Sequence, residues 1–170
     1  MKSICFTLSG PFACFRKPDV NTKVYFTYNN IHKVALLGLL GAIIGLSGYR
    51  NENMYGKNDR VYPEFYEVLS SLKVSVRPNG KNGYFSKKIQ YFNNSVGYAS
   101  KEEGGNLQVR EQWLENPEWI IFLKQDNLNE LVWDKLCEYL LEKKSIFIPY
   151  LGRNDFPAQI SNVKTIELLS

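Results

Sequence analysis

Hydrophobic and polar positions alternate at the start of the chain. Ile4, Phe6 and Leu8 fall on one side of residues 3–9, and small or polar residues fall on the other. A period of two is typical of a strand with one buried face. Gly10-Pro11 ends this strand, and the polar and aromatic residues that follow show no helical period. We therefore expect a long loop up to residue 32.

Apolar residues fill every side of the segment Val34–Leu46, which predicts a buried helix. Gly38, Gly41 and Gly45 each cost up to about 1 kcal/mol of helix propensity relative to alanine. We expect a helix with three such residues to be pressed closely against a sheet or another backbone. The segment is shorter than the roughly 20 residues of a membrane span, and Ser9-Gly10-Pro11 interrupts any signal-peptide core. The sequence thus predicts a soluble, cytoplasmic protein with no membrane partner.

The rest of the chain predicts short strands, turns and a second long helix. Asn127, with Glu130 three residues later, predicts the start of that helix. It is expected to end near Lys143-Lys144, where the helix dipole favours cations. The other expected elements are a short helix from Pro63, a strand at 74–76, turns at 79–83, a strand-like run at 84–92, a flexible tip at 101–106, and strands at 109–114, 119–123 and 160–168.

With the short segments treated as insertions, the order of elements is strand, helix, strand, strand, helix, strand. This order predicts an α+β fold of the ferredoxin-like βαββαβ type, with an antiparallel sheet and two helices on one face. An inserted hairpin or thumb is expected at about 73–106, within a single domain spanning 1–170. Sheets of this kind also carry RNA-recognition domains, so the fold favours RNA binding by analogy.

Charge and cysteine content exclude few classes of function. The formal net charge is +4, which permits a polyanionic partner without requiring one. Cys5, Cys14 and Cys137 are far apart and lack the spacing of a zinc site or a disulfide framework. We expect all three to be reduced and structural. No cofactor or metal is predicted.

Few residues are suited to catalysis. His32 is the only histidine, and the sequence contains no GxSxG, P-loop or GxGxxG motif. A metal-independent ribonuclease is one hypothesis, with His32 as general acid or base and with Tyr25 or Tyr28 and Lys33 nearby. The alternative is that His32 caps the following helix or stacks on RNA.

Nucleic-acid binding has more support, because cations and aromatic residues are interleaved along the chain. They alternate around 15–17, 23–33, 77–91 and 150–153. Several of the basic residues and Gly152 also have a simpler interpretation. Lys87-Lys88 suits a solvated strand edge, and Lys143-Lys144 suits a helix end. Gly152 allows either a phosphate to approach backbone amides or the chain to turn a corner.

Several longer sequence motifs are typical of a known protein family. They are Leu8–Pro18 (LSGPFACFRKP), Thr27-Tyr28, His32–Leu46 (HKVALLGLLGAIIGL), Arg110-Glu111-Gln112, Pro149–Arg153 (PYLGR) and Phe156-Pro157-Ala158. Together they resemble the RAMP subunit that holds the five-prime handle of the guide RNA (crRNA) in type I CRISPR surveillance complexes (Cascade). The likeness is strongest to the subtype I-B form.

The resemblance implies an RRM-like ferredoxin fold with a glycine-rich loop near its end and an inserted segment that folds over the guide. It also implies a role in antiviral defence, in which the subunit caps one end of the complex. The implied partners are the crRNA handle, the backbone RAMP subunit, the large subunit and, through the assembled complex, target DNA. Family members usually continue beyond the position of Ser170, so we expect the family's C-terminal part to be absent from this sequence.

Cleavage of the guide precursor belongs to a different ribonuclease in the I-B form, whereas the corresponding I-C subunit cleaves it with a His, Lys and Tyr set. Because His32 has no second basic–histidine pair, we expect no enzymatic activity. The alternatives are a metal-independent endoribonuclease that processes precursor crRNA, and a protein-contact piece with aromatic interfaces at 84–92 and 113–119.

The residues expected to bind RNA are Arg16, Lys17, Asn21, Tyr28, His32, Lys33, Arg50, Lys87, Lys88, Arg110, Tyr150, Gly152 and Arg153. Lys81 is expected on the inserted hairpin beside Lys87 and Lys88.

Overall fold

The larger of the two sheets is four-stranded and antiparallel. The computed structural model describes residues 2–18, 23–49, 61–94, 97 and 101–167. The sheet contains β1 (Lys2–Ser9), β3 (Lys73–Pro78), β6 (Glu118–Lys124) and β7 (Gln159–Glu167), in the order β3-β6-β1-β7. Every neighbouring pair in it is antiparallel. The predicted α+β class with an antiparallel sheet is therefore confirmed.

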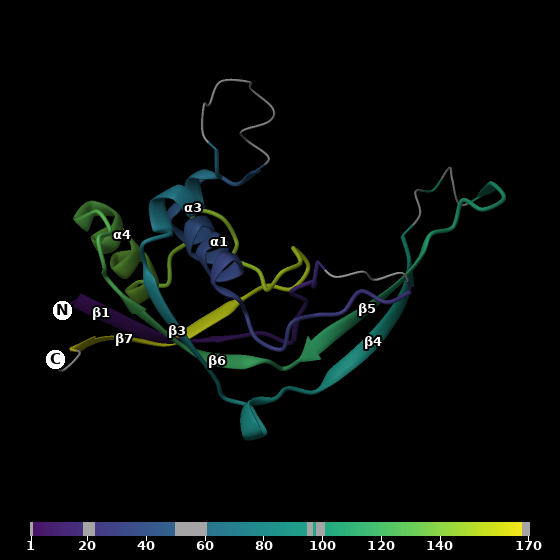
Figure 1. Cartoon of the computed structure of the whole chain (residues 1–170), viewed down its shortest axis with the longest axis horizontal. Helices are drawn as coiled ribbons and strands as arrows, with labels where there is room; N and C mark the ends of the chain where they lie inside the picture. Colours follow the sequence, from purple (N-terminus) through teal and green to yellow (C-terminus); the bar gives the residue numbers. More distant parts are fainter. Residues whose placement is uncertain (1, 19–22, 50–60, 95–96, 98–100, 168–170) are drawn as a thin grey trace.

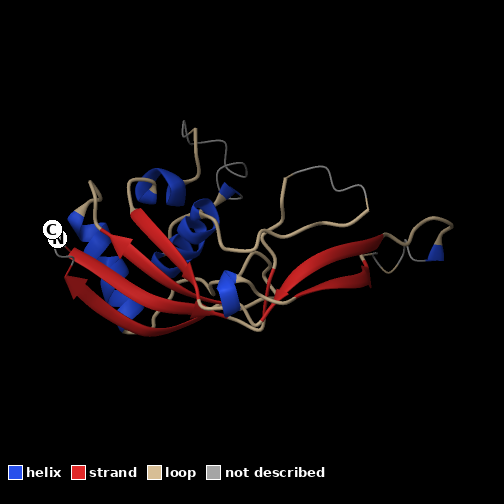
Figure 2. Ribbon diagram, turned by 60° about the horizontal axis from the view of Figure 1, so that its bottom comes forward, coloured by secondary structure: helices blue, strands red, loops and turns tan. Residues whose placement is uncertain are grey.

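A second, three-stranded sheet extends away from the first (Figures 1 and 2). It contains β2 (Phe12–Ala13), β5 (Gln108–Glu115) and β4 (Lys87–Asn93), in the order β2-β5-β4. The segment 73–106, expected as one insertion, is divided between the two sheets. Its first part is β3, which pairs with β6 because Val74 and Val76 face the core there. The long hairpin is made by β4 and β5.

Helices lie on one side of the larger sheet (Figure 1). They are α1 (Lys33–Ile44), α3 (Glu64–Leu69) and α4 (Glu130–Leu141). The 3₁₀ turn η1 spans Lys81–Gly83.

The helix cap predicted at Asn127 is wrong. The side chain of Asn129 accepts hydrogen bonds from the backbone of Leu131 (2.9 Å) and Val132 (3.4 Å). Asn127 instead adopts φ 53° in the preceding turn, a conformation that asparagine tolerates.

The core lies between the helices and the larger sheet. Alternate residues of the two central strands, such as Phe6 and Trp119, are almost completely buried against it. The cysteines are free, as predicted. Burial raises the pKa of the Cys14 and Cys137 thiols to about 11, so both stay protonated near neutrality. No helix in the described part of the chain is long and apolar enough to cross a membrane.

The glycines of α1 allow α3 to approach closely, as the sequence predicts. A Cβ atom on Gly41 would lie 2.6 Å from the Cβ of Phe65, whereas one on Gly38 would lie 3.8 Å from the ring of Phe65. Gly45 ends the helix at φ 85° and donates its N–H to the carbonyl of Gly41 at 2.9 Å. The close backbone approach is therefore with a helix rather than with the sheet.

We expect Gly41→Ala to lower the free energy of unfolding by about 1–3 kcal/mol, because the new methyl group would force Phe65 and α3 to move. Gly38→Ala is the matched control, since its methyl group fits in ordinary contact and gains helix propensity of up to about 1 kcal/mol. Urea unfolding of both variants measures the difference. Equal stability of the two would contradict the close contact at Gly41.

Candidate nucleic-acid interface

The predicted loop between β1 and α1 contains a short ordered ribbon. The segments 15–17 and 25–28 pair through two backbone hydrogen bonds, from Lys17 N–H to the Phe26 carbonyl (2.8 Å) and from Tyr28 N–H to the Phe15 carbonyl (2.9 Å). The buried hydroxyl of Thr27 accepts a third bond from Phe15 N–H at 2.9 Å. The ribbon gives the side chains on it fixed positions.

Two cations of this ribbon lie over aromatic rings. The Arg16 guanidinium is 3.2 Å from the centroid of the Tyr25 ring, and the Lys17 ammonium is 5.6 Å from that of Tyr28. Cation–π contacts of this kind hold a charge in place while leaving it at the surface. Arg16 and Tyr28 are both exposed. The ribbon therefore presents positive charge and ring faces side by side.

His32 is the N-cap of α1. Its Nδ1 accepts a hydrogen bond from Ala35 N–H at 3.2 Å, and its ring meets the edge of Tyr28 with centroids 5.5 Å apart. Burial lowers the pKa of the imidazole, which favours the neutral form. Since Nδ1 is the acceptor, the proton of neutral His32 is on Nε2. The capping interpretation of His32 is confirmed.

The glycine-rich loop is joined to the chain just before the ribbon. Cys14 N–H donates to the Leu151 carbonyl at 3.0 Å, and Leu151 N–H donates to the Phe156 carbonyl at 2.8 Å. Gly152 has φ 87°, and a Cβ there would lie 2.0 Å from the Cys14 carbonyl oxygen. Only glycine fits this position. Gly152 thus turns a corner against Cys14.

Arg153 is bound by two carboxylates. Its Nη1 lies 2.5 Å from Oε2 of Glu111, and its Nε lies 2.9 Å from Oδ1 of Asp155. Hydrogen bonding to Asp155 raises the pKa of the guanidinium, and the same bond lowers the pKa of Asp155. Glu111 is buried and also accepts from Trp113 Nε1 at 3.0 Å. The charge of Arg153 is therefore largely used inside the protein.

The rings around Arg153 complete this cluster. Its guanidinium carbon lies 5.3–5.6 Å from the ring centroids of Phe92, Trp113 and Phe156. Trp113 and Phe156 contact each other edge-on, with centroids 4.8 Å apart. Arg153 thus attaches the glycine-rich loop to the face of β5.

The structure brings together part of the predicted RNA-binding set. His32, Tyr150 and Gly152 line one groove of about 610 Å³ along α1. Lys33 lies at the same helix end but donates to the carbonyl of Ser70 at 2.8 Å, next to α3. Asn21 and Arg50 lie outside the described residues.

The hairpin residues are divided between two faces. Lys88 lies 4.0 Å from the centroid of Phe12 and 4.0 Å from a carboxylate oxygen of Glu115. Because side chains alternate along a strand, Lys87 and Arg110 lie on the face opposite Lys88 and Glu111. Arg110 lies 5.2 Å from the ring of Tyr91 on that face. These cations do not form one surface.

The role of Glu111 was not predicted from the sequence. A signal was present in the sequence, since Val109, Glu111 and Trp113 are two residues apart and so lie on one face of the strand. This face is buried at Val109 and Glu111 and half-buried at Trp113. A buried carboxylate needs a partner of opposite charge. The pattern did not identify Arg153 as that partner, because the two residues are far apart in the chain.

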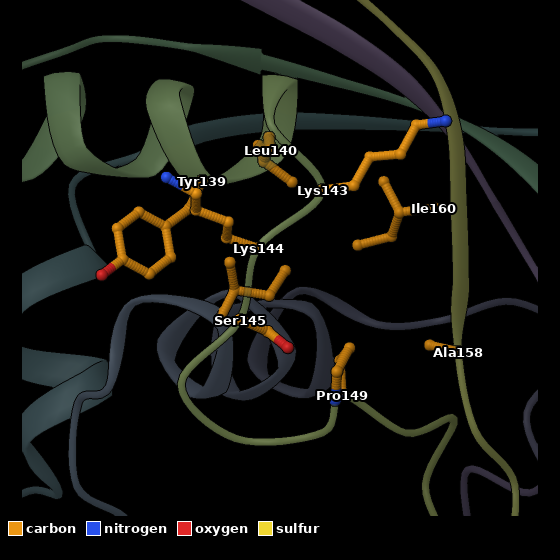
Figure 3. A pocket seen from close by; sticks show the side chains of 9 residues that line it. Tyr139, Leu140, Lys143, Lys144, Ser145, Pro149, Ala158 and Ile160 are labelled. Atoms are coloured by element: carbon orange, nitrogen blue, oxygen red, sulfur yellow. The ribbon is translucent and has the colours of Figure 1, made fainter.

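A second cavity, of about 170 Å³, lies between the end of α4 and β7 (Figure 3). Tyr139, Leu140, Pro149 and Ile160 line it, together with Lys143 and Lys144. Lys144 pairs with Glu142, and hydrogen bonding to this carboxylate raises the pKa of Lys144. The two lysines follow α4 directly, as the helix-end interpretation predicts. None of the predicted RNA-binding residues lines this cavity.

Comparison with known families agrees with the motifs in the sequence. The family described as CRISPR-associated protein (Cas_Cas5) matches residues 3–168. The chain belongs to this Cas5 family. No curated protein matches the sequence.

Solved structures share the fold of this Cas5 family member. A chain of a CRISPR RNA-guided surveillance complex superposes with a TM-score of 0.61 at 14% identity, covering 91% of this chain and 58% of that one. A crystal structure of a Cas protein gives a TM-score of 0.53 at 18% identity, covering 91% and 61%. A chain of a type IV-B CRISPR complex gives 0.52 at 10% identity, covering 98% and 90%. The Cas5 chain thus spans about three-fifths of the first two.

We expect Glu111→Gln and Arg153→Met each to lower the free energy of unfolding by about 1–3 kcal/mol, because each leaves the other partner without its ion pair. The loss of unfolding free energy in the double variant should be smaller than the sum of the two single losses by about 0.5–3 kcal/mol. Urea unfolding of all four proteins measures this coupling. Asp155→Asn is the control, since this exposed partner contributes about 1 kcal/mol or less. Additive losses would contradict the coupling.

Proposed function

We propose that this chain is the non-catalytic crRNA-binding subunit of a type I CRISPR surveillance complex (Cascade), of a form similar to subtype I-B. It holds the five-prime handle of the guide RNA and caps one end of the assembly in antiviral defence. The backbone RAMP subunit and the large subunit are its protein partners, and target DNA reaches it through the complex. The observation that carries this proposal is the pair of cations held over rings at Arg16 and Lys17.

The topology supports the same proposal. Leaving out β2, α3, η1, β4 and β5, the elements follow the order strand, helix, strand, strand, helix, strand. The sheet order β3-β6-β1-β7, with all neighbours antiparallel, suits the ferredoxin-like arrangement of RAMP proteins. The long β4–β5 hairpin corresponds to the inserted thumb.

The site suits single-stranded RNA for chemical reasons. Arg16 and Lys17 neutralise phosphates, and Tyr28 and Tyr150 offer exposed rings on which bases stack. The Nε2–H of His32 is a hydrogen-bond donor that needs no charge. Arg153 acts differently, as a positioning residue that holds the glycine-rich loop beside Cys14 and the ribbon.

We expect Arg16→Ala to weaken binding of a synthetic handle RNA and to lower the salt slope of the affinity by about one unit, because one phosphate contact is lost. Arg153→Met should weaken binding without changing the slope, since its charge is used by Glu111 and Asp155. Fluorescence anisotropy at several salt concentrations measures both quantities. An unchanged affinity and slope for Arg16→Ala would refute the assignment.

A metal-independent endoribonuclease that processes precursor crRNA is the second candidate, supported by the contact between the rings of Tyr28 and His32. His32→Asn separates the two functions, because asparagine also caps a helix but transfers no proton. Incubation of the wild type with a hairpin-bearing precursor and EDTA should give no cleavage. Cleavage that is lost in His32→Asn, while the protein stays folded, would establish the nuclease instead.

A further inference from the structure

The larger sheet has one face that no described helix covers, since α1, α3 and α4 all lie on the other side (Figures 1 and 2). We call it the open face. Strand register places its side chains in three rows that cross β3, β6, β1 and β7 in that order. The rows are Lys73–Lys124–Ser3–Ile166, Ser75–Phe122–Cys5–Lys164 and Arg77–Ile120–Thr7–Ser161.

The central strand β6 supplies the large apolar side chains of the open face, and Cys5 and Thr7 of β1 lie beside them. Ile120 and Phe122 lie on β6, a central strand, and both are half-buried. Neither contributes to the core on the opposite side of the sheet. An aromatic ring on the flat face of a sheet can stack on an unpaired base.

Cations lie around this centre. Arg77 is on the edge strand β3, Lys164 is on the edge strand β7, and Lys124 ends β6. None of the three has an ion-pair partner among the residues that the structure describes. Three strand spacings of about 4.8 Å separate the edge strands by about 14 Å. A strand of nucleic acid therefore has room to cross the centre with phosphates near both edges.

The charges also favour an anionic ligand. Lys73 and Lys124 are directly opposite each other in the register, an arrangement that destabilises a sheet. Lys73 forms an ion pair with Asp126, with its Nζ 3.3 Å from Oδ2, which offsets this repulsion. Glu118 is the acidic residue of β6, and it is occupied by a hydrogen bond from the Asn79 amide. Within the described ranges, Arg77, Lys124 and Lys164 have no carboxylate partner of this kind.

We propose that the open face binds a single-stranded segment of nucleic acid, with Phe122 and Ile120 beneath the bases and Arg77, Lys124 and Lys164 at the phosphates. This surface is separate from the ribbon and the glycine-rich loop, so the inference does not rest on the proposed handle site. A protein partner fits less well, since lysine is depleted in protein–protein interfaces and most of these cations are lysines.

Labelled oligouridine and oligodeoxythymidine of equal length test the proposal on the full chain, by fluorescence anisotropy at several salt concentrations. Arg77→Glu and Lys164→Glu should each weaken binding several-fold and lower the salt slope by about one unit or more. Phe122→Ala should weaken it roughly five- to a hundred-fold. Equal effects on both oligonucleotides indicate recognition of bases and phosphates, and effects on RNA alone indicate contacts to the 2′-hydroxyl.

Lys143→Glu is the matched control, because it makes the same charge change at an exposed site beyond α4. If Lys143→Glu weakens oligonucleotide binding as much as Arg77→Glu and Lys164→Glu do, the loss of affinity comes from the net charge alone and the proposal is wrong. Photocrosslinking of 5-iodouridine RNA to the unaltered protein avoids any loss of folding. The proposal requires crosslinks in the peptide that contains Phe122, and crosslinks confined to the ribbon would refute it while leaving the handle site intact.

The protein alternative has its own outcome. If Arg77→Glu prevents incorporation into the assembled surveillance complex but leaves oligonucleotide affinity unchanged, the open face is a subunit interface and the proposal is wrong.

Discussion

The buried charge of Glu111 is the constraint on which the candidate interface depends. A carboxylate in this position of β5 needs a counterion, and Arg153 supplies it from the glycine-rich loop. This ion pair brings the loop against β5, where Leu151 and Gly152 meet the backbone of Cys14. Tyr25 joins β5 through the N–H and carbonyl of its own backbone. One strand thus holds both the loop and the ribbon that carries Arg16.

The cations of this basic chain divide by their partners. Arg153 and Lys88 are paired with carboxylates, and Lys33 is bound to a backbone carbonyl. Arg16 and Lys17 lie over aromatic rings. The ring of Tyr25 stabilises the charge of Arg16 without neutralising it. The number of Lys and Arg residues, 21, therefore overstates how many cations are available to a polyanion. The position of each cation matters more than its presence.

The packing of α1 determines which surfaces stay exposed. Because Gly41 admits Phe65, α3 lies directly against α1, and both lie on the same side of the larger sheet as α4. The apolar residues of that side form the core. The opposite side keeps Phe122 and its surrounding cations at the surface. The described helices α1, α3 and α4 thus leave this other face uncovered.

The sequence alone determined the elements with a clear local period and the family. The alternation at 3–9 and the apolar run at 34–46 correspond to β1 and α1, because strand and helix periods are local properties. The types of residue at the site, such as Arg16, Tyr28 and His32, were also readable. The residues that these side chains contact could not be predicted from the sequence. The ribbon, the cap at Asn129 and the pairing of Arg153 with Glu111 depend on backbone geometry and on contacts between distant segments, which only the tertiary structure brings together.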